Sequence, residues 1–578
     1  MITETKPRDV QVLPLGLDTL ILRSRTWDRL KFEIEYAREQ GTTANSFLIQ
    51  GDKIALFDPP GESFTDIFLE ALQQRIDPRK IDYLILAHVN PNRAVTIKAL
   101  LDLAPQVTFV CSNPGAIALR SLLPDSELKI LTVRGEETLD LGKGHLLQFI
   151  TTPIPRWSDE LCTYDPQTEI LFTDKLFGAH ICSDQVLDEG WTTFGEDRRY
   201  YFDAVMAAYA RQVETALEKL APFLGLESKT IVAPGHGPMV RYGLWELVQD
   251  YQQWSQEQRA KETTVTMIYA SAYGNTAILG QAIARGITKA GVAVETINCE
   301  FVQPEEIKTA IAKSAGFTIG SPTLGGHLPT PVQTALGVIL ANASKSQLAG
   351  VFGSFGWSGE AVDLIEGKLK DAGYTFGFET IRVKFKPTEV HLQLCEEAGI
   401  DFAQAIKKAK KLRTPRQPVS ESQAARTEQA VGRIIGSLCV LSAKQGEVAT
   451  GMLADWVSQA TFNPPGITLA VGKERAIESL LYPGSKFVLN ILAEGKQLRK
   501  YFMKSFVPGE DRFAGVDTEV AQNGSPILTG ALAYLECEIE QRMECGDHWV
   551  IYATAENGKV LQQEGVTAVH HRKSGSHY

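Results

Sequence analysis

The stretch TVTMIYASAYGNTAILGQAIARGITKAG, residues 264–291, decides the fold of the middle of the chain. An apolar run ends in small and hydroxyl-bearing residues, and an amphipathic helical pattern begins immediately afterwards. Free backbone N–H groups at a helix N-terminus, next to serine, threonine and glycine, form a cradle for an anion. The sequence therefore predicts a strand, a phosphate-binding loop and a helix in direct succession.

Strand and helix patterns go on alternating from about 264 to 410, five of each, which predicts an open, parallel, doubly wound sheet. Two more loops with glycines follow strand-like runs, so three loops should meet at one edge of this sheet. The candidate cofactor-binding residues are Ser271, Ala272, Tyr273, Gly274, Asn275, Thr276, Ser321, Pro322, Thr323, Leu324, Gly325, Gly353, Ser354, Phe355, Gly356, Trp357 and Ser358. The pattern resembles the flavodoxin family, which implies FMN with Tyr273 or Trp357 near its ring system.

From about 431 onwards, short strand-like runs predict a β-barrel-type domain. The stretch GMLADWVSQATFNPP (451–465) and the later GDH (546–548) resemble the flavin reductase family. That resemblance implies a second flavin, FMN or FAD, with NAD(P)H as a transient donor. The candidate residues are Trp456, Ser458, Gln459, Thr461, Asn463, Asn490 and His548. The polar tail with His570, His571 and His577 is expected to be disordered.

Before residue 260, short strand-like runs mix with helical patterns and predict an αβ sandwich with largely antiparallel sheets. His88 in HVNPNR, Asp174 after the run EILF, and His236 in PGHGP resemble the metallo-β-lactamase-type fold. With the two flavin domains behind it, the chain resembles flavodiiron proteins of the cyanobacterial and plastid diflavin type. We expect a first domain over 1–260, a flavodoxin-like domain over 264–410, a linker over 411–430 and a reductase-like domain over 431–578.

The resemblance also identifies the positions of a diiron site, and here most of its ligands are substituted. His88, Asp174 and His236 keep ligand residues, Asn90 and Asn92 replace a Glu and an Asp, and Arg93 and Arg156 replace two His. The family's carboxylates contribute −3, whereas here one Asp and two Arg give −1 + 2 = +1. Arginine cannot ligate a metal or lose its proton. We expect iron to be absent or substoichiometric, with Arg93 and Arg156 facing an anion such as chloride or phosphate.

The function implied by the resemblance is electron transfer from NAD(P)H, or from ferredoxin, through the flavins to O2, which is reduced to water. NO is an alternative acceptor. Because one chain's flavodoxin domain faces another chain's metal site in the family, a chain with substituted ligands is expected in a hetero-oligomer with an iron-bearing paralogue. A homodimer or homotetramer is the alternative.

Three other interpretations stay open at this stage. A single metal could bind to His88, Asp174 and His236. The chain could be a non-catalytic regulatory or scaffold subunit with an anion-binding pocket. A metallo-hydrolase is the most remote reading, because the ligands that would activate water are lost. No residue is assigned a catalytic role beyond the substituted diiron positions.

The composition indicates which compartment and which kinds of partner to expect. A net charge of −11 and a pI near 5.6 leave no basic stripe for nucleic acid. No apolar run reaches the roughly 18 residues needed to cross a bilayer, so no membrane insertion is expected. The eight cysteines include no CxxC pair, which is typical of a reducing compartment. A cytoplasmic location is therefore expected.

Overall fold

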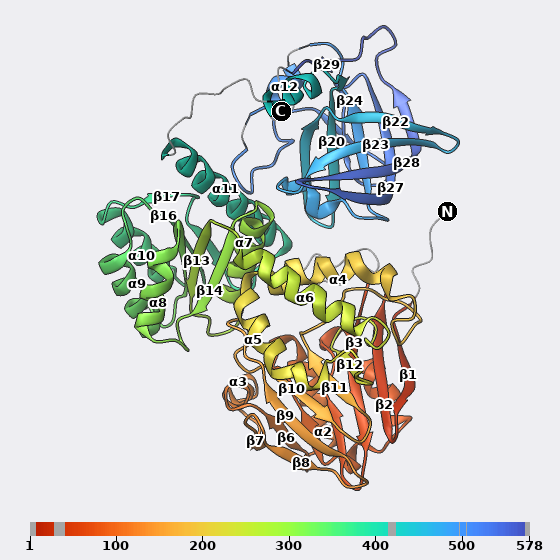
Figure 1. The fold of residues 1–578 in the computed structure, drawn as a ribbon, viewed down its shortest axis with the longest axis vertical. Helices are drawn as coiled ribbons and strands as arrows, with labels where there is room; N and C mark the ends of the chain where they lie inside the picture. Colours follow the sequence, from red (N-terminus) through yellow and green to blue (C-terminus); the bar gives the residue numbers. More distant parts are fainter. Residues whose placement is uncertain (1–6, 28–40, 414–422, 496, 505, 573–578) are drawn as a thin grey trace.

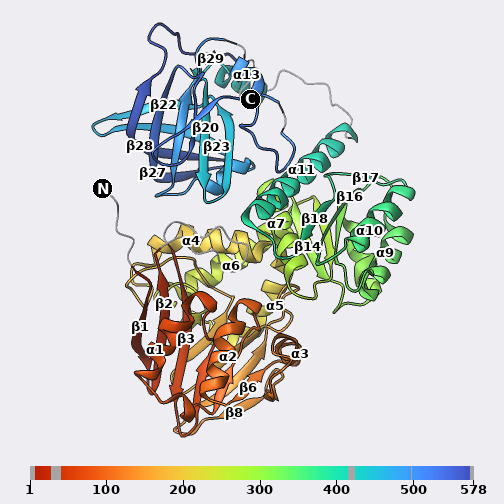
Figure 2. The same ribbon diagram turned by 180° about the vertical axis from the view of Figure 1, so that it is seen from behind.

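The computed structural model describes residues 7–27, 41–413, 423–495, 497–504 and 506–572. In them the chain forms a sandwich, a doubly wound sheet and a barrel, in the order that the sequence predicts (Figure 1). The view from behind shows helix α11 between the doubly wound sheet and the barrel (Figure 2). None of the described helices is both long enough and apolar enough to span a membrane.

The first domain is an αββα sandwich, as predicted. Its two sheets run in the orders β1-β2-β3-β4-β5-β6-β7 and β12-β11-β10-β9-β8. The second sheet is largely antiparallel, as predicted, with only β11 and β12 parallel. The first sheet is mixed, because α1, α2 and α3 cross over between β4, β5, β6 and β7, which pair in parallel. The strands are β1 (Asp9–Gly16), β2 (Thr19–Thr26), β3 (Thr42–Gln50), β4 (Ile54–Phe57), β5 (Tyr83–Ile85), β6 (Thr108–Cys111), β7 (Lys129–Thr132), β8 (Thr138–Asp140), β9 (Leu146–Thr151), β10 (Leu161–Asp165), β11 (Ile170–Asp174) and β12 (Ile231–Pro234). The helices are α1 (Thr65–Gln73), α2 (Ala94–Leu103), α3 (Asn113–Leu122), α4 (Gly195–Tyr201), α5 (Ala210–Leu220) and α6 (Leu244–Arg259).

Aromatic side chains join the two sheets of the sandwich. The Phe172 ring of β11 lies 4.9 Å from the Phe47 ring of β3 and 4.4 Å from the Phe57 ring of β4, centroid to centroid. All three are almost fully buried. Such pairs contribute about 0.5–1.5 kcal/mol each beyond the area they bury. This packing holds the strand ends of the two sheets in a fixed relation, and the candidate metal site lies at those ends.

The middle domain confirms the predicted doubly wound sheet. Its strands run in the order β14-β13-β15-β16. The short β17 pairs with the start of β16 and β18 pairs with its end, and every pair is parallel. The strands are β13 (Thr264–Tyr269), β14 (Ala293–Asn298), β15 (Gly316–Pro322), β16 (Leu348–Phe355), β17 (Thr375–Phe376) and β18 (Ile381–Lys384). The helices are α7 (Asn275–Lys289), α8 (Pro304–Lys313), α9 (Thr330–Asn342), α10 (Glu360–Asp371) and α11 (Glu389–Arg413).

One buried apolar cluster runs from the first domain into the middle domain without a break. Phe202, in the π-helix η5 (Phe202–Met206), packs against Tyr251 and Trp254 of α6, with ring centroids 5.1 and 5.2 Å away. The Gln281 side chain of α7 donates a 2.9 Å hydrogen bond to the Ala204 carbonyl in η5. The two domains therefore share a core instead of being joined only by a flexible connection.

The C-terminal domain confirms the predicted β-barrel-type fold. Its main sheet runs in the order β21-β20-β24-β27-β28-β23-β22. The strands are β19 (Gly436–Ser437), β20 (Cys439–Gln445), β21 (Val448–Ala454), β22 (Val457–Phe462), β23 (Pro465–Gly472), β24 (Lys486–Ile491), β25 (Thr518–Val520), β26 (Pro526–Leu528), β27 (Ala533–Cys545), β28 (His548–Val560) and β29 (Val569–His570). Two short helices, η8 (Ala476–Leu480) and α13 (Gln497–Phe502), flank the barrel.

The segment 411–430, expected to be a linker, is partly helical. Helix α11 continues to Arg413, and α12 (Gln423–Val431) precedes the barrel. The prediction missed α12 because it weighed polarity and proline, whereas QAARTEQA is made mainly of good helix formers. Residues 414–422 lie outside the described residues.

Candidate functional site

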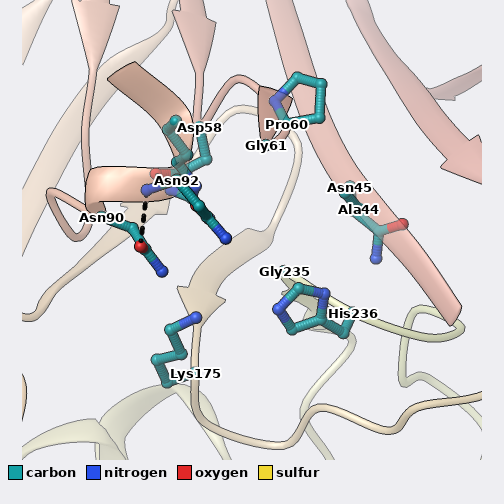
Figure 3. A pocket seen from close by; sticks show the side chains of 11 residues that line it. Ala44, Asn45, Asp58, Pro60, Gly61, Asn90, Asn92, Lys175, Gly235 and His236 are labelled. Carbon is teal, nitrogen blue, oxygen red and sulfur yellow. Dashed lines mark hydrogen bonds and ion pairs between the residues drawn. The ribbon is translucent and has the colours of Figure 1, made fainter. Parts of the chain in front are cut away.

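The candidate metal centre lies where strands of both sheets end. Asp58 follows β4, His88 lies just beyond β5, Asp174 ends β11 and His236 follows β12. Close to these residues is a small cavity with room for about one water-sized species, about 10 Å³, and His236 and Lys175 point towards it (Figure 3). Its lining residues are Ala44, Asn45, Asp58, Pro60, Gly61, Asn90, Asn92, Arg93, Lys175, Gly235 and His236.

The Arg93 guanidinium bridges two buried carboxylates at this site. Its Nη1 donates to Asp58 Oδ1 at 2.9 Å, and its Nη2 donates to Asp174 Oδ1 at 3.2 Å. The Arg93 side chain is only 8% exposed, and those of Asp58 and Asp174 are 5% and 0% exposed. A fixed cation thus sits between the two acids.

Burial and charge push the pKa values of the two acids apart. Burial, and next to it the negative charge of Asp174, raise the pKa of Asp58 to about 7 against the opposing effect of Arg93. Burial alone would also raise the pKa of Asp174, but Lys175 and Arg93 outweigh it and lower that pKa to about 2. Asp174 is therefore the firmly ionised partner of the guanidinium.

The two asparagines that the sequence predicts at carboxylate positions differ in their hydrogen bonds. Asn90 is the N-cap of the 3-10 helix η3 (Pro91–Arg93), because its side-chain oxygen accepts a 3.1 Å hydrogen bond from the Asn92 amide. The side-chain oxygen of Asn92 is buried without a hydrogen-bond partner among the described residues. The loop shape that would present ligands thus remains, held by an amide cap.

The two retained histidines are each oriented by one ring nitrogen. His88 Nδ1 lies 2.8 Å from Asp159 Oδ1, and His236 Nδ1 lies 2.8 Å from the Thr43 carbonyl oxygen. Asn45 holds the loop of His236, donating through Nδ2 to the carbonyls of Pro234 and Gly237 at 2.8 and 2.9 Å. Carboxylate and carbonyl partners of this kind are typical of metal-site histidines, so the supporting frame of such a site persists.

The second cation at the cavity is Lys175, which the sequence analysis did not identify. Arg156, predicted to face the same site, is not among the lining residues. Its guanidinium lies 4.8 Å from the Trp157 ring centroid instead. Lys175 directly follows Asp174 in the sequence, so the residue next to a predicted ligand was the signal that could have identified it. With both acids ionised, the formal charge of Asp58, Asp174, Arg93 and Lys175 is −2 + 2 = 0.

These residues do not fit a diiron centre. Among the described residues, no three His, Cys, Asp or Glu side chains converge closely enough to hold a metal ion. Asp174 Oδ1 accepts from Arg93, and two divalent ions beside a guanidinium and an ammonium group would meet strong repulsion at short range. Non-haem iron prefers hard carboxylate ligands, and Asn90 and Asn92 offer amides at the cavity instead.

The three loops of the middle domain come together as predicted. Ser271 Oγ accepts a 3.1 Å hydrogen bond from the Ala277 amide, and Thr276 Oγ1 lies 2.8 Å from Ser354 Oγ. Gly274 has a φ of +79°, and a Cβ added there would meet nothing within 4 Å, so the loop leaves open space over the start of α7. The Ser271 amide donates to Glu300 Oε2 at 3.0 Å, a partner that the sequence analysis missed.

This edge fits a flat, phosphorylated cofactor. Tyr273 and Trp357 are 73% and 90% exposed, an unusual placement for large rings in a folded domain. Phe385 lies edge-on to Trp357, with ring centroids 6.1 Å apart. The buried Thr323 Oγ1 has no hydrogen-bond partner among the described residues and could receive one from a ligand. The loops therefore offer an anion cradle next to exposed aromatic surface.

The candidate residues of the barrel are only partly brought together. Trp456 and His548 lie side by side, with ring centroids 4.9 Å apart. Ser458, Gln459 and Thr461 lie on the edge strand β22, and Asn463 follows its end at the tip of the β22–β23 hairpin. Thr461 Oγ1 donates to the Pro464 carbonyl at 2.7 Å. Trp456 and His548 thus lie together, while the others follow the hairpin away from them.

The prediction for Asn490 is wrong in its chemistry. Its side chain is fully buried, donates to Ser442 Oγ at 3.0 Å and accepts from the Leu528 amide at 2.8 Å. The amide is therefore used inside the barrel wall and cannot reach a cofactor. The sequence does not show the cross-strand partners of the apolar run FVLNIL. It therefore cannot distinguish an asparagine that binds a ligand from one that binds a neighbouring strand.

Models of three protein families match the chain in the order that the structure shows. The family described as ODP family beta lactamase matches residues 42–237, Flavodoxin matches 267–399 and Flavin reductase like domain matches 431–576. Together with the site geometry they define the class: a flavin-dependent oxidoreductase with a flavodiiron core and an added flavin reductase domain. The flavodoxin and reductase domains make it a diflavin protein.

The relatives narrow the class to a family. The chain is 68% identical over 578 residues to Putative diflavin flavoprotein A 6 of Nostoc sp. (strain PCC 7120), covering 100% of both chains. It is 64% identical to Putative diflavin flavoprotein A 3 of Synechocystis sp. (strain PCC 6803), covering 99% of this chain and 96% of that one. A solved structure of the metal-soaked Flv1 flavodiiron core from Synechocystis sp. PCC6803 is 64% identical, with a TM-score of 0.67, covering 70% of this chain and 100% of its own. The chain belongs to the diflavin flavoprotein A family of flavodiiron proteins.

Proposed function

We propose that this chain passes electrons from NAD(P)H, or from ferredoxin, through two flavins towards O2, which is reduced to water with the help of an iron-bearing paralogue. The observation that carries the proposal is the Arg93 bridge between Asp58 and Asp174 at the position of the family's metal ligands. The two flavin domains have the folds and loops that flavin binding needs. The metal centre has the strand ends and loops of such a site but lacks most of the ligands. Electron supply and O2 chemistry would then be divided between two chains.

The middle domain supports FMN as its cofactor. Ser271, Thr276 and the amides at the start of α7 would hold the phosphate, because a helix N-terminus favours a negative group. Tyr273 and Trp357 would lie along the ring system. FMN, when bound, supplies the exchange of one or two electrons, and the protein positions its ring and sets the charge around it. The barrel would hold the second flavin, FMN or FAD, near Trp456 and His548.

The hetero-oligomer is testable with purified proteins. The chain, its iron-bearing paralogue and a mixture of the two are assayed for NAD(P)H-dependent O2 consumption and for peroxide. The proposal expects the mixture to exceed the sum of the separate activities and to form water. Reduction of O2 to water at the full rate by this chain alone, as a homodimer or homotetramer, would contradict it. NO in place of O2 tests the alternative acceptor.

Metal analysis tests the site itself. The chain, purified after expression with added iron, is expected to hold well under one iron per molecule. Two irons per chain, removed only by chelation, would overturn the substituted-site interpretation. One iron or zinc per chain, lost on changing His88, Asp174 or His236 to alanine, would favour the single-metal alternative. Arg93 and Lys175 would then have to leave the site.

A regulatory or scaffold role is the second candidate function, and Lys175 favours it. Its ammonium group faces a cavity with room for about one small species, where an anion such as chloride could sit. Anion-dependent activity of the hetero-oligomer, lost in Lys175→Met, would support this role. A metallo-hydrolase remains the most remote alternative, since Asn90, Asn92 and Arg93 do not supply the metal ligands that would activate water. We keep 1–260, 264–410 and 431–578 as domain limits and infer a cytoplasmic location.

A further inference from the structure

The C-terminal segment of the chain is built into the barrel. The Glu494 amide donates to the Val566 carbonyl at 2.8 Å, and the Ala568 amide donates to the Leu492 carbonyl at 2.9 Å. Strand β29 then pairs with β19. The disorder expected for this tail is therefore wrong for His570 and His571, while His577 lies outside the described residues. This segment, residues 566–572, is called the C-terminal strap below.

The C-terminal strap delivers two side chains to the candidate flavin site. His570 Nδ1 lies 2.7 Å from Asp455 Oδ2, which fixes the strap beside the residue preceding Trp456. The Arg572 guanidinium carbon lies 4.8 Å from the Trp456 ring centroid. Trp456 is the same ring that approaches His548. One indole thus has an imidazole and a guanidinium against it.

Arg572 has an unused donor in this buried position. The residue is only 8% exposed, and its Nη1 is buried without a hydrogen-bond partner among the described residues. No carboxylate in the described part of the chain forms an ion pair with it. A buried guanidinium left without an acceptor is costly, whereas a planar guanidinium stacked on an indole is well placed to bind an anionic group. The unused donor therefore points to an acceptor on a ligand.

We propose that Arg572 donates to an anionic group of the flavin bound in the reductase domain. Two groups share this chemistry: the phosphate of the flavin nucleotide, and the N1–C2 carbonyl edge of the ring, which becomes negative on reduction. In both cases the C-terminal strap completes the flavin site. This inference rests on the proposed second flavin.

The test uses the full chain with Ser271→Asp, which puts a carboxylate into the phosphate loop of the middle domain, so that only the reductase domain binds flavin. FMN and riboflavin are titrated by fluorescence quenching in this background and with Arg572→Gln added. We expect Arg572→Gln to weaken FMN binding about 10- to 100-fold. Arg572→Lys, which keeps the charge, should recover part of the loss. Riboflavin binding that stays unchanged assigns the phosphate, and riboflavin binding that weakens equally assigns the ring edge.

Controls separate the possible failures. Arg499→Gln removes the same charge from α13 in the same domain and should leave FMN affinity unchanged. If the Ser271→Asp chain binds no flavin, the second flavin itself is wrong, whatever Arg572 does. If it binds FMN equally well with and without Arg572→Gln, the assignment of Arg572 is wrong. An effect confined to the KM for NAD(P)H would also overturn it. Circular dichroism of each variant confirms that it is folded.

Discussion

The Nη2 atom of Arg93 lies 3.2 Å from Oδ1 of Asp174, so a guanidinium of the chain itself binds the carboxylate oxygen that a metal ion would need. Both acids that contact Arg93 also have strained backbones, with φ of +46° at Asp58 and +40° at Asp174. Such conformations cost about 1–3 kcal/mol and persist only where the surroundings enforce them. The site is thus a rigid frame whose central cation belongs to the chain.

Arg93→Ala should destabilise the protein strongly. Removing one partner of a buried ion pair leaves uncompensated charge, which costs about 3–5 kcal/mol. Protonation of Asp58, whose pKa is raised to about 7, would moderate the loss below neutral pH. Urea denaturation at pH 8 measures the effect. Arg79→Ala breaks the exposed pair with Asp77 and serves as the matched control, expected to change nothing measurable. Equal losses of stability in Arg93→Ala and Arg79→Ala would contradict the role of Arg93 in stabilising the two buried carboxylates.

Restoring the family's ligands should restore iron. The substitutions Asn90→Glu, Asn92→Asp, Arg93→His and Arg156→His change the formal charge counted from the sequence by −4, from +1 to −3. We expect elemental analysis to show iron rising towards about two per chain, since carboxylates and imidazoles suit non-haem iron. Arg93→His alone should gain far less, because the amides remain. A fourfold variant with no more iron than the parent would show that Lys175 or the cavity size also blocks the metal.

Local patterns in the sequence were enough to place the loops and strand ends. The loop at Ser271 and the histidines at strand ends depend on neighbours within a few residues, and in the structure the loop does lead into α7 and the histidines do follow strands. The partners of Arg93 are different: Asp58 is 35 residues away and Asp174 is 81. No local pattern indicates such contacts. The same limit explains why Asn490 was misread and why Arg572, far from Trp456 in the chain, was missed.

Glu478 should hold the reductase domain against the middle domain. It accepts from Lys289 of α7 at 2.7 Å and from Arg542 of β27 at 3.2 Å, and Lys289 also reaches Glu396 of α11 at 2.7 Å. Burial would raise the pKa of Glu478, but Lys289 and Arg542 lower it to about 2. Because the folded pKa is depressed, its contribution is present above pH 4.5 and is lost as pH falls towards 2.

Glu478→Gln should therefore loosen the contact between these domains by about 3–5 kcal/mol. Hydrogen exchange is the measurement, and faster exchange is expected in η8 and the end of α7. Glu556→Gln, which alters the exposed pair with Lys486 on the barrel, is the control and should have an effect under about 1 kcal/mol. Unchanged protection of η8 in Glu478→Gln would refute the role of this buried pair.

Asp401 should make the protein less stable as pH rises. Burial, and then the nearby Glu397, raise its pKa to about 6, above the usual value near 4. The folded state binds the proton more tightly, so stability falls as pH rises from about 4 to 6 and then stays lower. Asp401→Asn should gain on the order of 1 kcal/mol at pH 7, discounted for partial exposure, and nothing at pH 3.5. A gain of equal size at both pH values would assign the effect to something other than ionisation.

Gly353 and Gly274 offer a test of how the FMN loops are built. A Cβ on Gly353 would lie 2.3 Å from the Ser321 carbonyl oxygen and 2.4 Å from Val362 Cγ2, so β15 and β16 would have to separate. Gly353→Ala should cost about 1–3 kcal/mol through overpacking and should weaken FMN binding.

Gly274 has space for a Cβ but a φ of +79°, so Gly274→Ala should cost only the backbone strain, about 1–2 kcal/mol. FMN titration and thermal unfolding, run on both variants, give the comparison. In Gly353→Ala, bound FMN should not recover the lost stability, because the clash lies within the sheet. In Gly274→Ala, excess FMN should recover most of it, because phosphate binding favours the strained loop. If FMN instead restored the stability of Gly353→Ala and not that of Gly274→Ala, the phosphate loop, and not the sheet edge, would limit FMN binding.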